Sequence, residues 1–382
     1  MAKLLWTPSE QRIQNSNMQT LMDFIAKDGH QVNNYQELYD FSIRLPQLFW
    51  NYVWEFGSFV QTKAHTRVLE NPNKMPGAKW FPGAQINFAQ NLLKFRDDRP
   101  AITSYDEKGK QQTLSYAQLF NQVARLSHWL KEQGIQPGDK VVGFMPNVPQ
   151  TIVAMLAATS LGAIWSSCSP DFGLQGVLDR FGQIEAKVLI TTDGYFYNGK
   201  TLNSLEKLNT IVPHLKTLEQ IVVVPYVQKD LNQAQVNEAL NAKQAHSKIS
   251  LFADCLNNTS TNINFAALPF DHPLYILYSS GTTGVPKCIV HSAGGTLIQH
   301  YKELAFHTDI KPDDVVFYYT TCGWMMWNWM VSTLMTGATL VIYDGSPFYP
   351  GANTLWDMAQ QEKISVFGCS AKYLSHLEKL KY

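Results

Sequence analysis

Residues 278–287 have the sequence Tyr278-Ser279-Ser280-Gly281-Thr282-Thr283-Gly284-Val285-Pro286-Lys287, and they directly follow an apolar run at residues 274–277. An apolar run that leads into glycine and hydroxyl residues predicts a buried strand followed by a phosphate-binding loop. Glycine lets backbone N–H groups approach an anion closely, the hydroxyl groups add donors, and Lys287 adds a positive charge. A helix is expected at about residues 295–306. A glycine-rich turn without a ligand is the alternative interpretation.

The segment differs from the P-loop of common nucleoside triphosphatases. Counted from Gly281, that pattern requires glycine where Pro286 stands and serine or threonine where Cys288 stands. The segment instead resembles the nucleotide-binding signature of the adenylate-forming enzymes, in which hydroxyl and glycine residues precede Gly-x-Pro-Lys. The resemblance implies an α/β fold, the N-terminal domain of that family, with doubly wound, mostly parallel sheets.

Composition narrows the class of protein. The 382 residues are 45% hydrophobic, and 31 basic residues balance 31 acidic ones. This predicts a large core and neither a nucleic-acid surface nor a polybasic membrane-binding face. Five cysteines without a Cys-x-x-Cys pair favour free thiols in a reducing, cytoplasmic compartment. The most apolar stretch, residues 151–165, is short and predicts a buried helix and not a membrane span.

Patterning along the chain predicts two regions. Residues 1–94 are rich in aromatic side chains and predict a helical lead segment that packs on the main domain. Residues 95–382 alternate between helical and strand patterns, which is typical of a parallel sheet. We expect helices at about 119–130 and 148–161, strands at 141–145, 187–191 and 221–224, and a polar surface excursion at 228–248. A final helix at 374–380 ends the chain without a closing strand, as in a fragment of a longer enzyme.

Four further segments, residues 80–89, 167–173, 289–295 and 318–329, resemble the acetyl-CoA synthetase group and, within it, the branch that activates acetoacetate. The resemblance implies ATP-dependent ligation of acetoacetate to CoA through an acetoacetyl-adenylate, with Mg²⁺ assisting. It also places the Thr-Glu motif, the ribose-binding aspartate and the C-terminal domain with its lysine beyond residue 382, so the chain alone is expected to be inactive. Two alternatives stay open: a ligase for acetate or propionate, and a nucleotide-binding fragment without turnover.

The resemblance assigns three groups of site residues. Thr282, Thr283 and Lys287 would be catalytic, Thr282 could contact Mg-ATP, and the whole nucleotide loop comprises Ser279, Ser280, Gly281, Thr282, Thr283, Gly284 and Lys287. Lys200 would meet CoA, unless it is an ordinary surface lysine. The acyl pocket would comprise Gly323, Trp324, Met325, Met326, Trp327 and Asn328. Within it, Trp324 is the strongest candidate, and Asn328 is a candidate donor to the ketone. The alternative for these residues is plain packing in the core.

Overall fold

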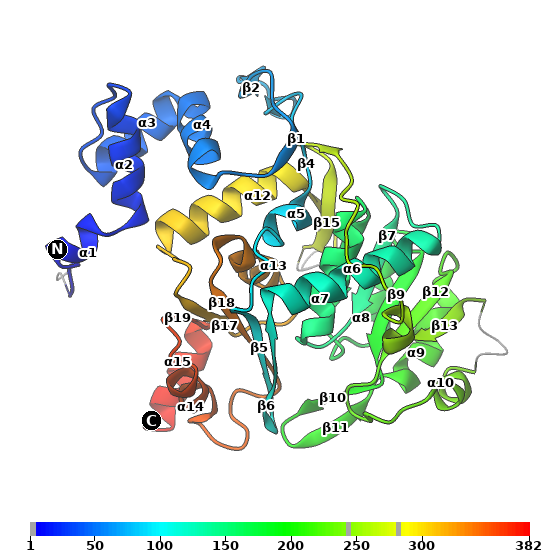
Figure 1. Ribbon diagram of the computed structural model, residues 1–382. Helices are drawn as coiled ribbons and strands as arrows, with labels where there is room; N and C mark the ends of the chain where they lie inside the picture. Colours follow the sequence, from blue (N-terminus) through cyan, green and yellow to red (C-terminus); the bar gives the residue numbers. More distant parts are fainter. Residues whose placement is uncertain (1–4, 242–245, 280–283) are drawn as a thin grey trace.

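The computed structural model describes residues 5–241, 246–279 and 284–382. Two mainly parallel sheets lie side by side, and the lead helices lie at one end of the molecule (Figure 1). One cluster of buried apolar side chains extends from the lead helices through helices of the body to strands of both sheets. The predicted α/β class with mostly parallel sheets is therefore confirmed.

The larger sheet has, among the described residues, seven strands in the order β13-β12-β9-β7-β8-β15-β16. All neighbours are parallel except β15 and β16, which form an antiparallel pair at the edge. A fully buried β7 explains why its sequence is an apolar run without alternation. The strands are β7 (Lys140–Phe144), β8 (Ile164–Cys168), β9 (Val188–Thr192), β12 (Gln220–Val224), β13 (Lys248–Leu251), β15 (Pro273–Tyr278) and β16 (Cys288–Ser292).

The second sheet has the order β19-β17-β18-β5-β6 within the described ranges, and only β6 runs antiparallel to its neighbour. Its strands are β5 (Pro100–Asp106), β6 (Gly109–Ser115), β17 (Val315–Tyr318), β18 (Thr339–Asp344) and β19 (Val366–Gly368). Smaller antiparallel pairings join β1 (Gln61–Lys63), β4 (Gln85–Ile86) and β14 (Leu268–Pro269), β2 (Leu69–Glu70) with β3 (Lys79–Trp80), and β10 (Gly194–Tyr197) with β11 (Lys200–Asn203).

Local sequence explains where the main helices begin and end. Ser115 and Gln118 form a capping box at the start of α6, and Gly134, with φ +82°, lies just after its end. Helix α7 is buried on nearly all sides, which accounts for the apolar stretch in its sequence. The helices of the body are α5 (Phe88–Leu92), α6 (Tyr116–Glu132), α7 (Pro149–Ser160), α8 (Leu174–Phe181), α9 (Leu205–Ile211), η1 (Val212–His214), α10 (Gln233–Ala239), α11 (Phe252–Cys255), α12 (Ala293–Tyr301), η2 (Lys302–His307), α13 (Met325–Val331), η3 (Ser332–Thr336), α14 (Thr354–Gln361) and α15 (Ala371–Lys379).

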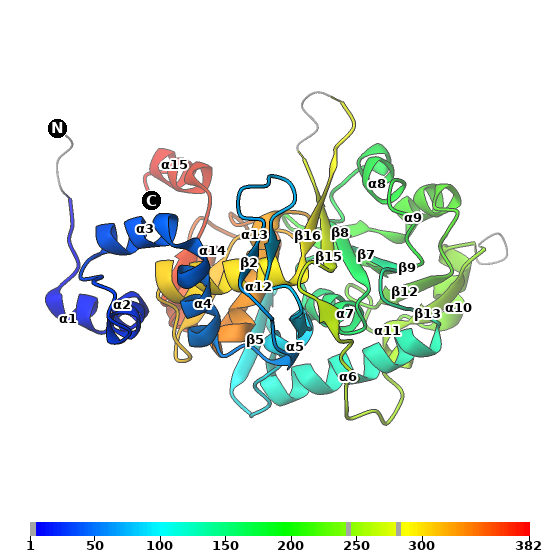
Figure 2. The ribbon, with the colours of Figure 1, turned by 90° about the horizontal axis from the view of Figure 1, so that it is seen from above.

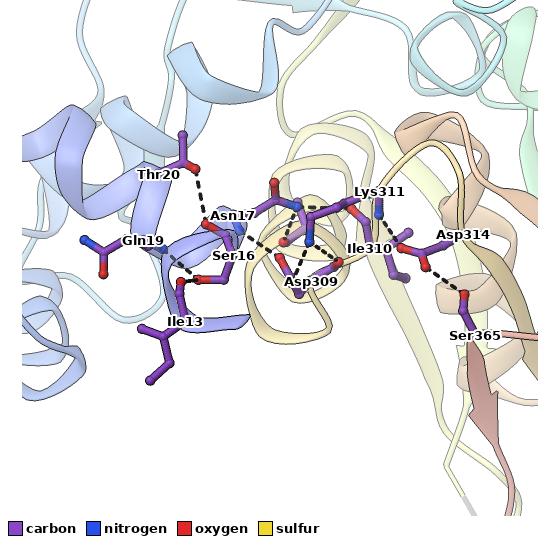
Figure 3. A network of polar contacts seen from close by, with 11 residues as sticks. Ile13, Ser16, Asn17, Gln19, Thr20, Asp309, Ile310, Lys311, Asp314 and Ser365 are labelled. Carbon is purple, nitrogen blue, oxygen red and sulfur yellow. Dashed lines mark hydrogen bonds and ion pairs between the residues drawn. The ribbon is translucent and has the colours of Figure 1, made fainter. Parts of the chain in front are cut away.

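The lead segment contains α1 (Glu10–Gln14), α2 (Asn17–Lys27), α3 (Tyr35–Arg44) and α4 (Pro46–Gly57), and it packs on the body. Asn17, the first residue of α2, makes polar contacts with the body (Figure 3). Its backbone N–H donates to Asp309 Oδ1 at 2.7 Å, and its side-chain amide donates to the carbonyl oxygens of Ala305 and Ile310 at 3.0 and 3.2 Å.

Two segments differ from the expected pattern. The polar stretch at 228–248 contains α10 and then supplies β13, an edge strand of the larger sheet, because Lys248–Leu251 pairs with β12. The expected helix at 295–306 begins earlier, at Ala293, and changes at Lys302 from α-helical to π-helical hydrogen bonding. Among the described helices, none combines the length and the apolar character needed to cross a membrane.

Candidate active site

The predicted phosphate-binding loop joins the two strands of the β15–β16 hairpin. Figure 2 shows this hairpin extending from the edge of the larger sheet. Two hydrogen bonds close the base of the loop: the Ser279 N–H donates to the Lys287 carbonyl at 3.0 Å, and the Lys287 N–H donates to Ser279 Oγ at 2.9 Å. Ser280, Gly281, Thr282 and Thr283 lie outside the described residues. Ser279 and Lys287 are thus held opposite each other where the loop begins and ends.

Part of the described end of the loop is accessible to solvent. Lys287 and Gly284 are exposed, and Gly284 has φ +140°, a conformation that favours glycine. Gln183 Nε2 donates to the Pro286 carbonyl at 2.9 Å and so attaches the returning side of the loop to the segment after α8. Lys287 is therefore accessible to an anion in solution.

Two sequence motifs that lie far apart in the chain contact each other at the carboxyl ends of the strands. Ser167 Oγ donates to the Cys322 carbonyl at 2.6 Å, and a Cβ built on Gly323 would lie 3.4 Å from the backbone nitrogen of Ser169. Cys322 is completely buried and its thiol donates to the Met145 carbonyl at 2.9 Å. Ligands of open α/β sheets bind at these carboxyl ends, so the contact lies where a substrate site is expected.

A cleft of about 640 Å³ opens between β16, α12 and the start of α13. Met325 and Met326, which the resemblance assigns to an acyl pocket, line the cleft, and Trp329 adds a third large side chain. Trp329 lies four residues after Met325 and so falls on the same face of α13, a helical spacing that could have identified it from the sequence. The full lining comprises Tyr275, Val290, His291, Ser292, Gly295, Thr296, Gln299, His300, Glu303, Met325, Met326 and Trp329.

The other predicted pocket residues lie in different surroundings. Trp324 is 59% exposed and stands at the N-cap of α13, outside the cleft lining. Trp327 is completely buried and its indole N–H donates to Asn147 Oδ1 at 2.9 Å, so it packs in the core. Asn328 is also buried, and neither atom of its side-chain amide has a hydrogen-bond partner among the described residues.

Polar groups also line the cleft. Tyr275 is buried, and its hydroxyl lies near Thr296 but makes no hydrogen bond of normal geometry within the described chain. His300 Nδ1 lies 2.7 Å from Ser332 Oγ, and burial lowers the pKa of His300 to about 4. Burial also lowers the pKa of His291. Both imidazoles are therefore neutral at pH 7, and the cleft offers hydrogen-bonding groups without a histidine charge.

Lys200 lies away from this cleft, at the start of β11. It faces Tyr197 across the two-residue turn of the β10–β11 hairpin, and it is exposed. The structure therefore brings β16 and the start of α13 together at one cleft, whereas Lys200, the predicted CoA contact, belongs to a separate hairpin near the second sheet (Figure 1).

Comparison with known proteins identifies the class. The family model described as "AMP-binding enzyme" matches residues 88–381, and the model described as "Acetyl-coenzyme A synthetase N-terminus" matches residues 35–92. The chain therefore belongs to the AMP-binding enzyme family.

Named relatives narrow the similarity to acetoacetyl-CoA synthetases. The chain is 44% identical to that of Rhizobium meliloti over 98% of its own length and 42% identical to that of Xenopus tropicalis over 99%; in each case it spans 56% of the relative. The solved acetoacetyl-CoA synthetase of Streptomyces lividans matches with a TM-score of 0.92 at 37% identity, over 100% of this chain and 57% of that one. The chain thus spans about half the length of the curated relatives it matches.

Proposed function

We propose that the protein to which this chain belongs ligates acetoacetate to CoA, with ATP, through an acetoacetyl-adenylate. The observation that carries the proposal is the common cleft: β16, which returns from the nucleotide loop, and the start of α13, which bears the acyl segment, line the same 640 Å³ space. A carboxylate bound there would lie next to the phosphates held by the loop. The similarity to acetoacetyl-CoA synthetases over nearly the whole chain supports this choice of acid.

In the first step a carboxylate attacks the α-phosphate of ATP, so two anions must be brought together. We assign charge neutralisation and alignment to the nucleotide loop, with Lys287 as the cation and Thr282 and Thr283 as hydroxyl donors. The exposed Lys287 beside the closed Ser279–Lys287 base supports this role. Mg²⁺ would reduce the phosphate charge, and we propose Thr282 as its nearest contact in this chain. No group of three acidic, histidine or cysteine side chains within the described ranges is arranged to hold a metal ion.

Recognition of the acid is assigned to the start of α13. Met325, Met326 and Trp329 form an apolar wall that suits the methyl group of acetoacetate. Asn328 stays our candidate donor to the ketone, because a buried amide without a partner gains from a ligand that supplies one. Gly323 would allow the close contact with residues 167–173, and Trp324 would border the site from outside.

Two further assignments are proposed on sequence grounds. We propose a helical N-terminal segment at 1–94 and an AMP-binding core from 95 onward; the family-model matches at 35–92 and 88–381 support this division. A cytoplasmic location is proposed from the five cysteines and their spacing.

The proposal is tested with the longest natural reading frame that contains this chain. Formation of acyl-adenylate and thioester is measured with acetoacetate, acetate and propionate, and acetoacetate is expected to give the highest kcat/KM. A higher kcat/KM with acetate or propionate would contradict the proposal and would favour a ligase for that acid instead. Nucleotide binding without any adenylate would leave only the binding function.

A variant separates the role of the loop from that of the rest of the site. Lys287→Ala is expected to slow adenylation on the order of a hundredfold, because one charged donor to the transition state is lost, and to affect thioester formation from preformed adenylate much less. Lys229→Ala, at an exposed lysine between β12 and α10, is the matched lysine control. Equal slowing of both half-reactions in Lys287→Ala would contradict the phosphate role.

A further inference from the structure

The β10–β11 hairpin carries Lys200 directly after a tight turn. Asn198 and Gly199 form the two-residue connection, with φ of +53° and +73°, and Tyr197 pairs with Lys200. Asn-Gly is the preferred sequence for such a connection because both central residues need a positive φ. The position of the Lys200 backbone is thus fixed by this turn, and the turn itself is exposed.

A carboxylate from a different sheet holds the turn. Glu107, in the connection between β5 and β6, accepts hydrogen bonds on Oε1 from the N–H groups of Asn198 at 2.5 Å and Ser346 at 2.7 Å. Its Oε2 accepts from the N–H of Gly199 at 2.7 Å. Two successive N–H groups that converge on one carboxylate form an anion-binding turn, and bonds to a charged acceptor are stronger than neutral ones. Glu107 therefore joins the hairpin tip to the segment after β18.

The neighbours of Glu107 contact the same hairpin region. The Lys108 ammonium group lies 4.0 Å from the centre of the Phe196 ring on β10. Asp106 Oδ2 lies 3.4 Å from the hydroxyl of Tyr226, whose ring packs against Phe196 at 5.5 Å. Asp106 at the end of β5, together with Glu107 and Lys108 in the connection that follows, thus contacts the hairpin or its neighbour Tyr226.

The opposite end of the hairpin is fixed independently. Asp193, just before β10, accepts hydrogen bonds from the N–H groups of Tyr226, Val227 and Gln228 at 2.7–3.0 Å. The base of the hairpin therefore belongs to the larger sheet, whereas its tip is held by Glu107 from the second sheet. Loss of the Glu107 contacts would free the tip and leave the base in place.

We propose that Glu107 is a positioning residue for CoA: by holding the Asn198–Gly199 turn, it places Lys200 where the lysine can meet a phosphate of CoA. The proposal rests on the proposed ligation to CoA and on the contact with CoA that the resemblance implies for Lys200. Glu107 is not a catalytic residue, because it acts only through the hairpin.

Glu107→Gln is the most informative substitution. The glutamine amide can keep its oxygen toward Asn198 and Ser346, but its NH₂ group then meets the Gly199 N–H, donor against donor. Glu37→Gln is the matched control, because the Glu37 carboxylate also accepts a backbone N–H, from Asn33 at 2.8 Å, but lies in the lead segment. Gly199→Ala disturbs the same turn from the other side, since a Cβ there would lie 2.7 Å from the Tyr349 ring.

The experiment uses the protein encoded by the longest natural reading frame that contains this chain. Calorimetry measures how tightly this protein binds CoA and 3′-dephospho-CoA. Three variants are each expected to bind CoA about tenfold more weakly, because one charged contact is lost: Glu107→Gln, Gly199→Ala and Lys200→Ala. Their affinity for dephospho-CoA should change much less. If Glu107 acts through Lys200, the double variant Glu107→Gln/Lys200→Ala binds CoA no more weakly than Lys200→Ala. Glu37→Gln binds as the wild type does.

The outcomes separate this inference from the proposed activity. Wild-type affinity in Glu107→Gln, full additivity in the double variant, or no CoA binding by the wild type would each overturn the positioning role. If the wild type formed no acetoacetyl-adenylate, the proposed activation of acetoacetate would be wrong. The comparison of CoA binding between the variants and the wild type would still test the role of Glu107. If Glu107→Gln does not fold, Gly199→Ala in the Lys200→Ala background supplies the same test.

Discussion

Asp344 is a carboxyl group buried at the end of β18. Its Oδ1 accepts the Asn147 N–H at 3.1 Å, and the Tyr226 hydroxyl lies 3.4 Å from its Oδ2 and equally far from Asp106. One hydroxyl proton cannot satisfy both carboxylates. Burial raises the pKa of Asp344 to about 7, and the negative charges of Asp106 and Glu107 act in the same direction.

This raised pKa predicts how stability depends on pH. Between pH 3.8, the ordinary pKa of aspartate, and about pH 7, the folded state holds a proton that the unfolded state has lost. Stability should therefore fall as the pH rises through this range, and the loss should be complete above it. Asp344→Asn keeps the acceptor for Asn147 and stays neutral, so the variant should lose this slope and be more stable than the wild type at pH 8 by about 1–3 kcal/mol.

Urea unfolding at pH 5 and pH 8 checks the prediction. Asp313→Asn, which removes the charge of an exposed aspartate, serves as the control. An Asp344→Asn variant with the same pH slope as the wild type would show that the carboxyl is ionised in the folded protein.

Among the secondary-structure elements, α2 depends on one residue for its polar attachment to the body. Asn17→Ala removes both side-chain hydrogen bonds to the carbonyl oxygens of Ala305 and Ile310, and we expect a loss of about 1–2 kcal/mol of stability. Thr20→Ala is the control, because its hydroxyl bonds only within the helix, to the Ser16 carbonyl. Thermal unfolding and limited proteolysis of the lead segment measure the effect. Equal protease resistance in both variants would contradict an anchoring role for Asn17.

The elements also show where patterning succeeds. The helix at about 119–130 and the buried runs of β7, β9 and β12 were predicted correctly because helical periodicity and burial are encoded in neighbouring residues. The strand β13 was not, because Lys248–Leu251 is only partly buried and becomes a strand by pairing with β12. Likewise, the residues of α13 resemble a pocket motif throughout, yet Met325 faces the cleft and Trp327 the core.

In the molecule as a whole, Asn147 connects the two sheets. It follows β7 of the larger sheet, and its side chain donates to the carbonyl oxygens of Thr320 and Tyr343 at 3.4 Å and accepts the Trp327 indole N–H. Asn147→Ala leaves that buried N–H unpaired, so we expect a loss of about 2–4 kcal/mol, more than for one exposed hydrogen bond. Asn237→Ala on the exposed side of α10 is the control.

Two probes of unfolding test whether the sheets behave as one unit. The unfolding midpoints measured by tryptophan fluorescence and by far-ultraviolet circular dichroism should decrease together in Asn147→Ala, because the hydrogen bonds of Asn147 join the two sheets. Separate transitions for the two probes would mean that the sheets unfold independently.

The amino-acid order alone determined the α/β class, the strand at residues 274–277 and the family, since these depend on periodicity and on motifs whose residues are adjacent in the chain. Folding decided which motif residues share a site. Met325, Met326 and Trp329 meet the strand after the nucleotide loop, whereas Trp327 bonds to Asn147 and Glu107 holds a hairpin 91 residues away. The direction of a side chain and its distant partners depend on how sheets and helices pack, and no local pattern of residues encodes that packing.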